Sequence, residues 1–310
     1  MESILVCGAA GFIGSNLTRA LIKLGHQVTC IDNLSTGSYE NLRDLECYPN
    51  FQFIQHDICD DLPEQKFDTI YNLACPASPI QYQRLAIETI NACTTGVSNL
   101  LKLVERTGAT FVHSSTSEVY GDPEVHPQHE GYTGNVSTLT DRACYDEGKR
   151  LAETLCYEYS KRGANIRIAR IFNTYGPFMA PNDGRVVSNF IVSALSEQPV
   201  AIYGNGLQTR SFCFVNDTVE GLIKLASFVS KDMFVCNIGS DAEITILQLA
   251  DTIQGLLGTT LPLEKLPLPM ADPKIRRPDI TRAKNMLDWS PQYALPTGLG
   301  LTIDYFSSII

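Results

Sequence analysis

A tyrosine and a lysine four residues apart, Tyr145 and Lys149, are the strongest candidates for chemistry in this sequence. Side chains at this spacing lie on one face of a helix. A nearby ammonium group favours the phenolate and so lowers the pKa of a tyrosine. Such a tyrosine can act as a base that takes a proton from a sugar hydroxyl while hydride leaves for a cofactor. The same spacing also occurs on surface helices whose lysines reach into solvent, so the pair needs support from other residues.

The carboxylate of Glu118 is a second candidate. It lies in STSEVYG at 115–121, directly after β-forming residues at 109–113 that predict a buried strand of a parallel sheet. A carboxylate there needs a partner or a chemical task, unless it is solvated where the strand reaches the surface. A cluster of Ser and Thr residues, including Thr116, shares this strand end.

A glycine-rich turn predicts a dinucleotide site. Gly8, Gly11 and Gly14 lie between an apolar strand and a helical pattern, where they allow a pyrophosphate to approach the helix N-terminus. An ordinary turn is the alternative, but Asp32 ends the next strand, where an acid can accept a hydrogen bond from the adenosine ribose. Asp32 would also repel the extra phosphate of NADP. The two features together predict NAD as the cofactor.

The elements that must position these residues form an alternating series. The predicted strands, separated by helical patterns, are 4–7, 27–31, 51–55, 69–73 and 110–114. This alternation predicts an α/β fold with a Rossmann-type doubly wound parallel sheet. We expect an NAD-binding domain at 1–172, with a return segment around 213–240. A smaller, mixed C-terminal lobe at 173–310 is expected mainly to bind substrate.

Composition narrows the function classes. The net charge of -10 argues against nucleic acid or an anionic membrane as the partner. The ten cysteines are scattered and show no zinc-binding spacing, so we expect reduced thiols and no metal. The first predicted strand leaves no room for a signal peptide, and no apolar run has membrane length. These features predict a cytoplasmic protein.

Six longer stretches carry a family resemblance over essentially the whole chain. They are STSEVYGDPEVHPQ (115–128), RACYDEGKR (142–150), ARIFNTYGP (169–177), NDGRVVSNFI (182–191), QTRSF (208–212) and RRPDI (276–280). On these residues the chain resembles the extended short-chain dehydrogenase/reductases, and most closely the UDP-glucuronate decarboxylases among them. The resemblance implies NAD-dependent decarboxylation of UDP-glucuronate to UDP-xylose through a 4-keto intermediate, with internal recycling of NADH.

Two alternatives stay open at this point. One is a sugar-nucleotide 4-epimerase or 4,6-dehydratase on the same scaffold, although Ser117 occupies the position where related dehydratases carry an acid. The more distant one is a non-catalytic protein that senses NAD, which the intact Tyr145 and Lys149 disfavour.

The resemblance also implies roles for individual residues. Tyr145 is expected to be the base at the C4 hydroxyl, Lys149 its activator, and Thr116 the third member of the catalytic group. Glu118 is expected to face the sugar, positioning it or assisting proton delivery. The expected substrate contacts are Glu118, Asn173, Arg185, Tyr203, Arg210 and Arg277, whereas Arg276 is expected to be a solvated loop charge. The expected cofactor contacts are Gly8, Gly11, Phe12, Ile13, Gly14, Asp32, Asn33, Ser35, Thr36, Asp57, Ile58, Leu73, Ala74, Cys75, Ser114, Tyr145, Lys149, Thr174 and Arg185.

The sequence departs from the resembled family at two places. Asn91, Ala92 and Cys93 stand where relatives commonly have Lys-Thr-Asn, and Cys75 replaces a serine. These changes could loosen cofactor contacts or alter which sugar nucleotide is accepted.

A homodimer through a helix bundle is also expected. The segments 87–104 and 143–159 carry more apolar positions than one sheet-facing stripe needs, and the corresponding helices pair across a two-fold axis in the resembled family. Packing within one subunit is the alternative. The apolar positions of the first segment are Ile87, Ile90, Val97, Leu100, Leu101, Leu103 and Val104.

Overall fold

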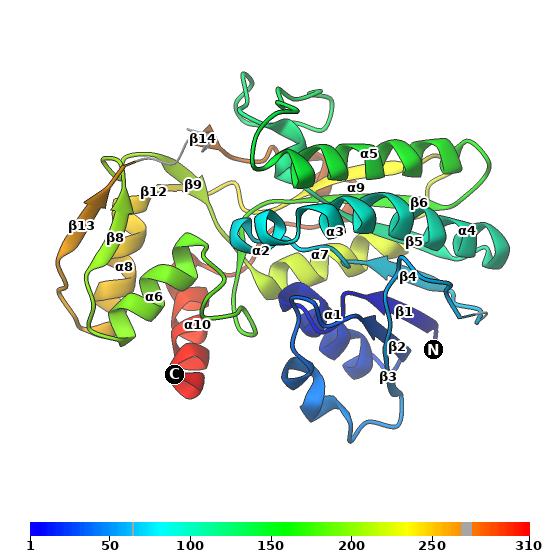
Figure 1. The fold of residues 1–310 in the computed structure, drawn as a ribbon, viewed down its shortest axis with the longest axis horizontal. Helices are drawn as coiled ribbons and strands as arrows, with labels where there is room; N and C mark the ends of the chain where they lie inside the picture. Colours follow the sequence, from blue (N-terminus) through cyan, green and yellow to red (C-terminus); the bar gives the residue numbers. More distant parts are fainter. Residues whose placement is uncertain (64, 268–274) are drawn as a thin grey trace.

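A seven-stranded parallel sheet forms the larger part of the molecule (Figure 1). The computed structural model describes residues 1–63, 65–267 and 275–310. The sheet runs in the order β11-β6-β5-β4-β1-β2-β3, which is the doubly wound order with its reversal beside β1. Its strands are β1 (Ser3–Cys7), β2 (Gln27–Asp32), β3 (Phe51–Gln55), β4 (Thr69–Asn72), β5 (Thr110–Thr116), β6 (Ile166–Ile171) and β11 (Phe234–Ile238). The predicted Rossmann-type fold is confirmed.

Helices cover both faces of this sheet (Figure 1). On one face, α4 and α5 pack their apolar side chains against the strands; on the other, α1 and α7 do so. Because the strands of the sheet are buried on both faces, their sequences are nearly continuous apolar runs. The helices are α1 (Phe12–Lys23), α2 (Pro79–Arg84), α3 (Ala86–Asn91), α4 (Val97–Thr107), α5 (Ala143–Ser160), α6 (Val186–Leu195), α7 (Val215–Ser227), α8 (Ile246–Leu257), α9 (Thr281–Leu287) and α10 (Leu295–Ile309).

A smaller lobe of short strands and helices lies beside the sheet, at the left of Figure 1. The chain enters it after β6, returns to the sheet through α7 and β11, and enters it again with α8. This crossing supports the proposed division into two domains with a return segment. The short strands are β7 (Thr174–Tyr175), β8 (Val200–Tyr203), β9 (Thr209–Ser211), β10 (Cys213–Phe214), β12 (Glu243–Thr245), β13 (Leu263–Leu266) and β14 (Ile275–Arg276).

The described residues also include three short helical turns. They are two 3₁₀ turns, η1 (Tyr39–Leu45) and η3 (Ser117–Tyr120), and one π-helical turn, η2 (Ala92–Gly96), between α3 and α4. The turn η3 begins where β5 ends. Strand β5 runs two residues further than the sequence predicts, because Ser115 and Thr116 pair with Arg170 and Ile171 of β6.

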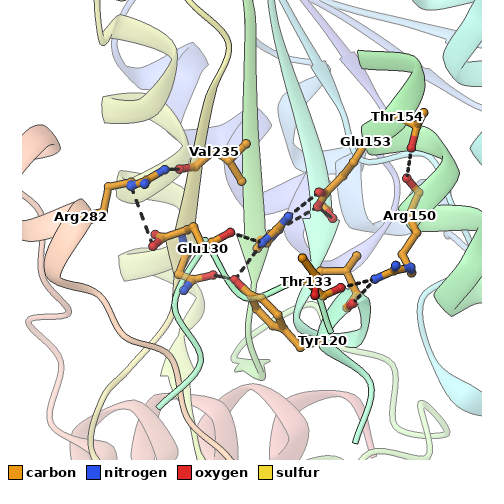
Figure 2. A network of polar contacts seen from close by, with 12 residues as sticks. Tyr120, Glu130, Thr133, Arg150, Glu153, Thr154, Val235 and Arg282 are labelled. Carbon is orange, nitrogen blue, oxygen red and sulfur yellow. Dashed lines mark hydrogen bonds and ion pairs between the residues drawn. The ribbon is translucent and has the colours of Figure 1, made fainter. Parts of the chain in front are cut away.

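A polar network joins α5, β6 and the loop at 120–130 (Figure 2). Arg170 of β6 donates to both carboxylate oxygens of Glu153, at 2.9 and 2.7 Å, and to the hydroxyl of Tyr120 at 3.1 Å. The Nη1 atom that donates to Tyr120 also donates to the carbonyl of Glu130, at 3.0 Å. Because every member is hydrogen-bonded, the network holds the loop that follows η3 against the sheet.

No helix in the described ranges is both long and apolar enough to cross a membrane. Within those ranges, no group of three or more His, Cys, Asp or Glu side chains is placed to hold a metal ion.

Candidate active site

A cavity of about 1090 Å³ lies between the carboxyl ends of the central strands and the smaller lobe. This is where ligands bind in open doubly wound sheets. Most of the residues predicted for the site line it. They are Gly8, Gly11, Phe12, Ile13, Gly14, Thr36, Leu73, Cys75, Ser114, Thr116, Glu118, Tyr145, Lys149, Asn173, Thr174, Arg185, Tyr203 and Arg210.

The glycine turn has the geometry that a diphosphate requires. Gly8 has φ +74°, and a Cβ there would lie 2.6 Å from the Leu73 backbone. A Cβ at Gly14 would lie 2.0 Å from the carbonyl oxygen of Gly8, so side chains are excluded from both positions. Helix α1 begins after Gly11 with no side-chain cap and no acidic residue in its first turn. Its N-terminus is therefore suited to an anion.

Asp32 lies beside this glycine turn, at the end of β2. The backbone N–H groups of Ala10 and Leu34 donate to its two oxygens at 2.9 and 2.8 Å, which fixes the carboxylate at the end of β2. Asn33 donates to Asp57 at 2.7 Å, and the N–H of Ser35 donates to Asn33 at 3.0 Å. The hydrogen bonds of Asn33, Ser35 and Asp57 thus lie next to Asp32, beside the glycine turn. The predicted cofactor residues outside the cavity lining of the described chain are Asp32, Asn33, Ser35, Asp57, Ile58 and Ala74.

The catalytic group assembles from β5 and α5. Tyr145 and Lys149 lie on one face of α5, and Lys149 Nζ is 5.7 Å from the centre of the Tyr145 ring. Lys149 also donates to the carbonyl of Ser114 at 2.8 Å, which ties α5 to the end of β5. Tyr145 stacks on Tyr82, with ring centres 4.9 Å apart. The structure therefore brings the tyrosine, lysine and Thr116 together at one cavity wall.

The pKa of Tyr145 differs from the sequence-based expectation. Burial raises this pKa well above its ordinary value, the neighbouring Cys75 adds to the rise, and the hydrogen bond with Thr116 opposes it. Lys149 is not among the main causes. The expectation that the Lys149 ammonium acidifies the phenol is wrong for this chain, because desolvation disfavours the phenolate more strongly.

Glu118 is the common partner of two arginines. Arg276 of β14 contacts both of its oxygens, one of them at 2.9 Å, and Arg142 bonds the second oxygen as well. Burial by itself raises the pKa of Glu118, but Arg276 and Arg142 outweigh it and hold the pKa below its ordinary value. Glu118 is thus a fixed anion at neutral pH, and a carboxylate in this state does not donate protons.

The structure reverses the expectation for the two adjacent arginines. Arg276 is 5% exposed and lines the cavity, so the interpretation of it as a solvated loop charge is wrong. The carbonyl of Arg277 instead accepts a hydrogen bond from the Gln128 N–H, and the Arg277 N–H donates to the side-chain oxygen of Gln128. Arg277 does not lie among the described residues that line the cavity. The sheet pairing explains the difference, since Arg276 pairs with Arg210 in the strand β9.

The remaining predicted substrate residues come from the smaller lobe and the loops before it. Arg210 is 8% exposed and donates to the carbonyl of Thr209 at 2.8 Å. Arg185 pairs with Asp183, with one contact at 2.8 Å, and lies 5.8 Å from the centre of the Phe12 ring. Asn173 donates to the carbonyl of Ser211 at 3.4 Å. The cavity thus has two cationic groups in its lining, Arg210 and Arg185, of which Arg185 lies beside Phe12 of the glycine turn.

Three site residues escaped the sequence analysis: Tyr82, Arg142 and Asp146. All lie close to Tyr145 or Glu118. The sequence could have indicated Arg142 and Asp146, because they are four residues apart in RACYDEGKR and such pairs meet on one helix face.

Asp146 gives a pH-dependent prediction. Burial and the nearby Glu118 raise the pKa of Asp146 to about 7. Because the folded-state pKa is above the unfolded one, the carboxyl contributes stability at acidic pH that is lost as pH rises through about 7. We therefore expect Asp146→Asn to melt higher than the parent at about pH 8, with a smaller difference at about pH 5. Thermal melts at both pH values check this; an equal difference at both contradicts it.

Comparison with known proteins gives a consistent result. A family model described as the NAD dependent epimerase/dehydratase family matches residues 4–239. UDP-glucuronic acid decarboxylase 1 of Danio rerio is 48% identical over 99% of this chain and 73% of its own length. UDP-glucuronic acid decarboxylase 4 of Arabidopsis thaliana is 48% identical over 98% of this chain and 68% of its own length.

A similar solved structure is the UDP-glucuronic acid 4-epimerase of Bacillus cereus, in complex with UDP-glucuronic acid and NAD. It has a TM-score of 0.89 and 29% identity, and 99% of each chain is covered. A family model matches most of the chain, and the decarboxylases are nearly half identical to it in sequence. Both findings agree with the presence of the glycine turn and of the Tyr145–Lys149 pair. The chain therefore belongs to the NAD dependent epimerase/dehydratase family and, within it, to the UDP-glucuronic acid decarboxylases.

Proposed function

We propose that this protein decarboxylates UDP-glucuronate to UDP-xylose, with NAD as a recycled cofactor. The observation that carries the proposal is that Tyr145, Arg276 and Arg210 line one cavity with the glycine turn. A base for the C4 hydroxyl and arginines for a carboxylate or diphosphate are the groups that this substrate needs. The identity of 48% to UDP-glucuronic acid decarboxylases supports the same substrate.

The residues of the chain have separable tasks in this reaction. NAD, when bound, accepts hydride from C4 of the sugar and later returns it. Tyr145 takes the proton of the C4 hydroxyl, and Thr116 and Lys149 hold the phenol in place. The resulting β-keto acid loses its carboxylate as carbon dioxide, because the new ketone accepts the electrons. Glu118 keeps Arg276 and Arg142 oriented at the cavity wall.

Mass spectrometry of the nucleotide sugar after incubation with UDP-glucuronate and NAD tests the proposal directly. Formation of UDP-xylose with release of carbon dioxide supports it. A product of unchanged mass identifies a 4-epimerase, and a product that has lost water identifies a dehydratase; either result contradicts decarboxylation.

The 4-epimerase is the second candidate, because similar solved structures include epimerases at 29% identity. The higher identity to decarboxylases disfavours it. Dehydration is disfavoured by Ser117, a neutral and buried residue beside Glu118.

We expect the protein to bind NAD more tightly than NADP. Asp32 is held by two backbone N–H groups at the end of β2, so it cannot turn away from a 2′-phosphate without losing both bonds. A second negative charge beside this carboxylate is unfavourable. Calorimetry with each cofactor checks the prediction, and equal affinities contradict it.

We also propose a homodimer formed through α3 and α5. Of the seven apolar positions at 87–104, Val97, Leu100, Leu101, Leu103 and Val104 are buried within the subunit, so packing in one chain accounts for them. Ile87 and Ile90 on α3 stay exposed, as do Leu151 and Tyr157 on α5. Helices α3 and α5 are neighbours, so these side chains can form one apolar surface.

Light scattering at micromolar protein checks the dimer. The parent is expected to have the mass of two chains, and Ile87→Glu with Leu151→Glu is expected to give monomers. Val229→Glu is the matched control, because Val229 is 91% exposed and lies outside both helices. A monomeric parent contradicts the proposal. The cytoplasmic location stays a prediction from the sequence.

A further inference from the structure

Two cysteine side chains from separate segments meet beside the catalytic group. Cys75 lies in the loop after β4, and Cys93 lies in the π-helical turn η2. Their sulfur atoms are 3.5 Å apart.

The two thiols differ in how easily a small molecule in the cavity can reach them. Cys75 is partly exposed and lines the cavity, as does Lys149, whereas Cys93 is only 1% exposed. Helix α5 closes the far side of Cys93, since a Cβ at Gly148 would lie 3.3 Å from its sulfur. A small molecule that enters the cavity therefore reaches Cys75 first, with Cys93 directly behind it.

We propose that Cys75 and Cys93 are a peroxide-oxidisable thiol pair, in which Cys75 is attacked first and Cys93 resolves the product into a disulfide. The proposal concerns the chain itself and does not depend on the sugar-nucleotide reaction. Among the described residues, no other pair of cysteine sulfurs is in hydrogen-bonding contact.

The chemistry balances with hydrogen peroxide as the oxidant. The Cys75 thiolate attacks one peroxide oxygen, the O–O bond breaks, and a sulfenic acid forms while the other oxygen leaves as water after gaining a proton. The sulfur of Cys93 then attacks that of Cys75, and the sulfenic oxygen leaves as a second water. The two thiols are oxidised by two electrons in total, and the peroxide is reduced to two waters. A dithiol reductant reverses the disulfide by exchange.

Electrostatics favour the same order of events. The hydrogen bond with Cys93 lowers the pKa of Cys75 to about 7, burial opposes this, and Lys149 lowers it further. The same contact raises the pKa of Cys93, followed by burial. The reactive thiolate is thus on the accessible sulfur.

Bond formation needs only a local movement. The sulfurs must approach from 3.5 Å to the roughly 2 Å of a disulfide bond. This draws the loop after β4 towards η2, a single π-helical turn within a longer helical segment, and such turns often occur at functional sites.

Peptide mapping by mass spectrometry tests the proposal. The full chain is treated with hydrogen peroxide at neutral pH, free thiols are alkylated, and peptides are mapped with and without dithiothreitol. We expect a Cys75–Cys93 linked peptide pair that has lost two hydrogens and separates on reduction. Cys93→Ser is expected to form no such link and to retain a sulfenic acid at Cys75, which dimedone labels.

Two other cysteines provide matched controls. Cys144→Ser removes a neighbouring thiol that contacts the carbonyl of Tyr82 at 3.5 Å, and the Cys75–Cys93 link should form as in the parent. Cys47 is exposed and serves as an internal measure of oxidation. The proposal is overturned if Cys47 is oxidised while Cys75 and Cys93 stay free, or if Cys75 links to Cys144. If Cys93→Ser does not fold, peptide mapping of the parent protein tests the proposal by itself.

Discussion

Tyr145→Phe is expected to lower the rate of UDP-xylose formation by roughly a hundred- to ten-thousandfold, the range typical for loss of a general acid or base. In the proposed reaction the phenol oxygen takes the C4 proton, and phenylalanine keeps the ring that stacks on Tyr82. Binding of UDP should change little, because the proposed nucleotide contacts, including Arg210 and Asn173, come from other elements. Single-turnover kinetics and calorimetry with UDP measure the two quantities.

Tyr71→Phe is the matched control for this experiment. Tyr71 is a tyrosine of β4 with only 2% exposure, and it lies outside the cavity lining. The control should turn over close to the parental rate. Parental turnover in Tyr145→Phe would contradict the assignment of Tyr145 as the base, and loss of UDP binding would show that the tyrosine acts in binding.

Glu118→Gln is expected to have the second largest effect, with a lower melting temperature and with turnover reduced roughly a hundredfold, as misplacement of substrate-positioning groups can cost. The amide keeps the shape of the side chain but removes the charge that faces Arg276 and Arg142. Two buried guanidinium groups then lose their counter-charge, which typically costs about 1–3 kcal/mol of folding free energy or more. They also lose the orientation in which they face the substrate.

A second glutamate that pairs with an arginine separates the effect on turnover from the effect on stability. Glu153 is paired with Arg170 through two hydrogen bonds, and its side chain is 14% exposed, as is that of Glu118 (Figure 2). It lies outside the cavity lining. Glu153→Gln should therefore lose stability and keep the parental turnover per folded molecule. Equal losses of turnover in both variants would contradict a specific role for Glu118 in the site.

The Glu118→Gln variant also differs from the parent in its response to pH. Because the arginines hold the folded-state pKa of Glu118 below its ordinary value, its contribution to stability is present at neutral pH and is lost as pH falls through that folded-state pKa. The difference in melting temperature between Glu118→Gln and the parent should thus shrink towards acidic pH.

The local patterns in the sequence were enough to predict the fold and the position of the catalytic pair. Alternating strands and helices predict a doubly wound parallel sheet, and the spacing of Tyr145 and Lys149 fixes their shared helix face whatever the helix packs against. The glycine turn was predictable for the same reason, because the exclusion of side chains at Gly8 and Gly14 acts within a few residues and against the adjacent strand.

The partners of the charged and thiol groups were decided only by the tertiary structure. Glu118 meets Arg276 across 158 positions of sequence, and no local rule selects that partner. The pairing of β14 with β9 sets Arg276 opposite Arg210 at the cavity, whereas Arg277 follows the end of β14 and lies outside the cavity lining of the described residues. In the same way, the sulfur contact of Cys75 and Cys93 exists because η2 packs beside the end of β4.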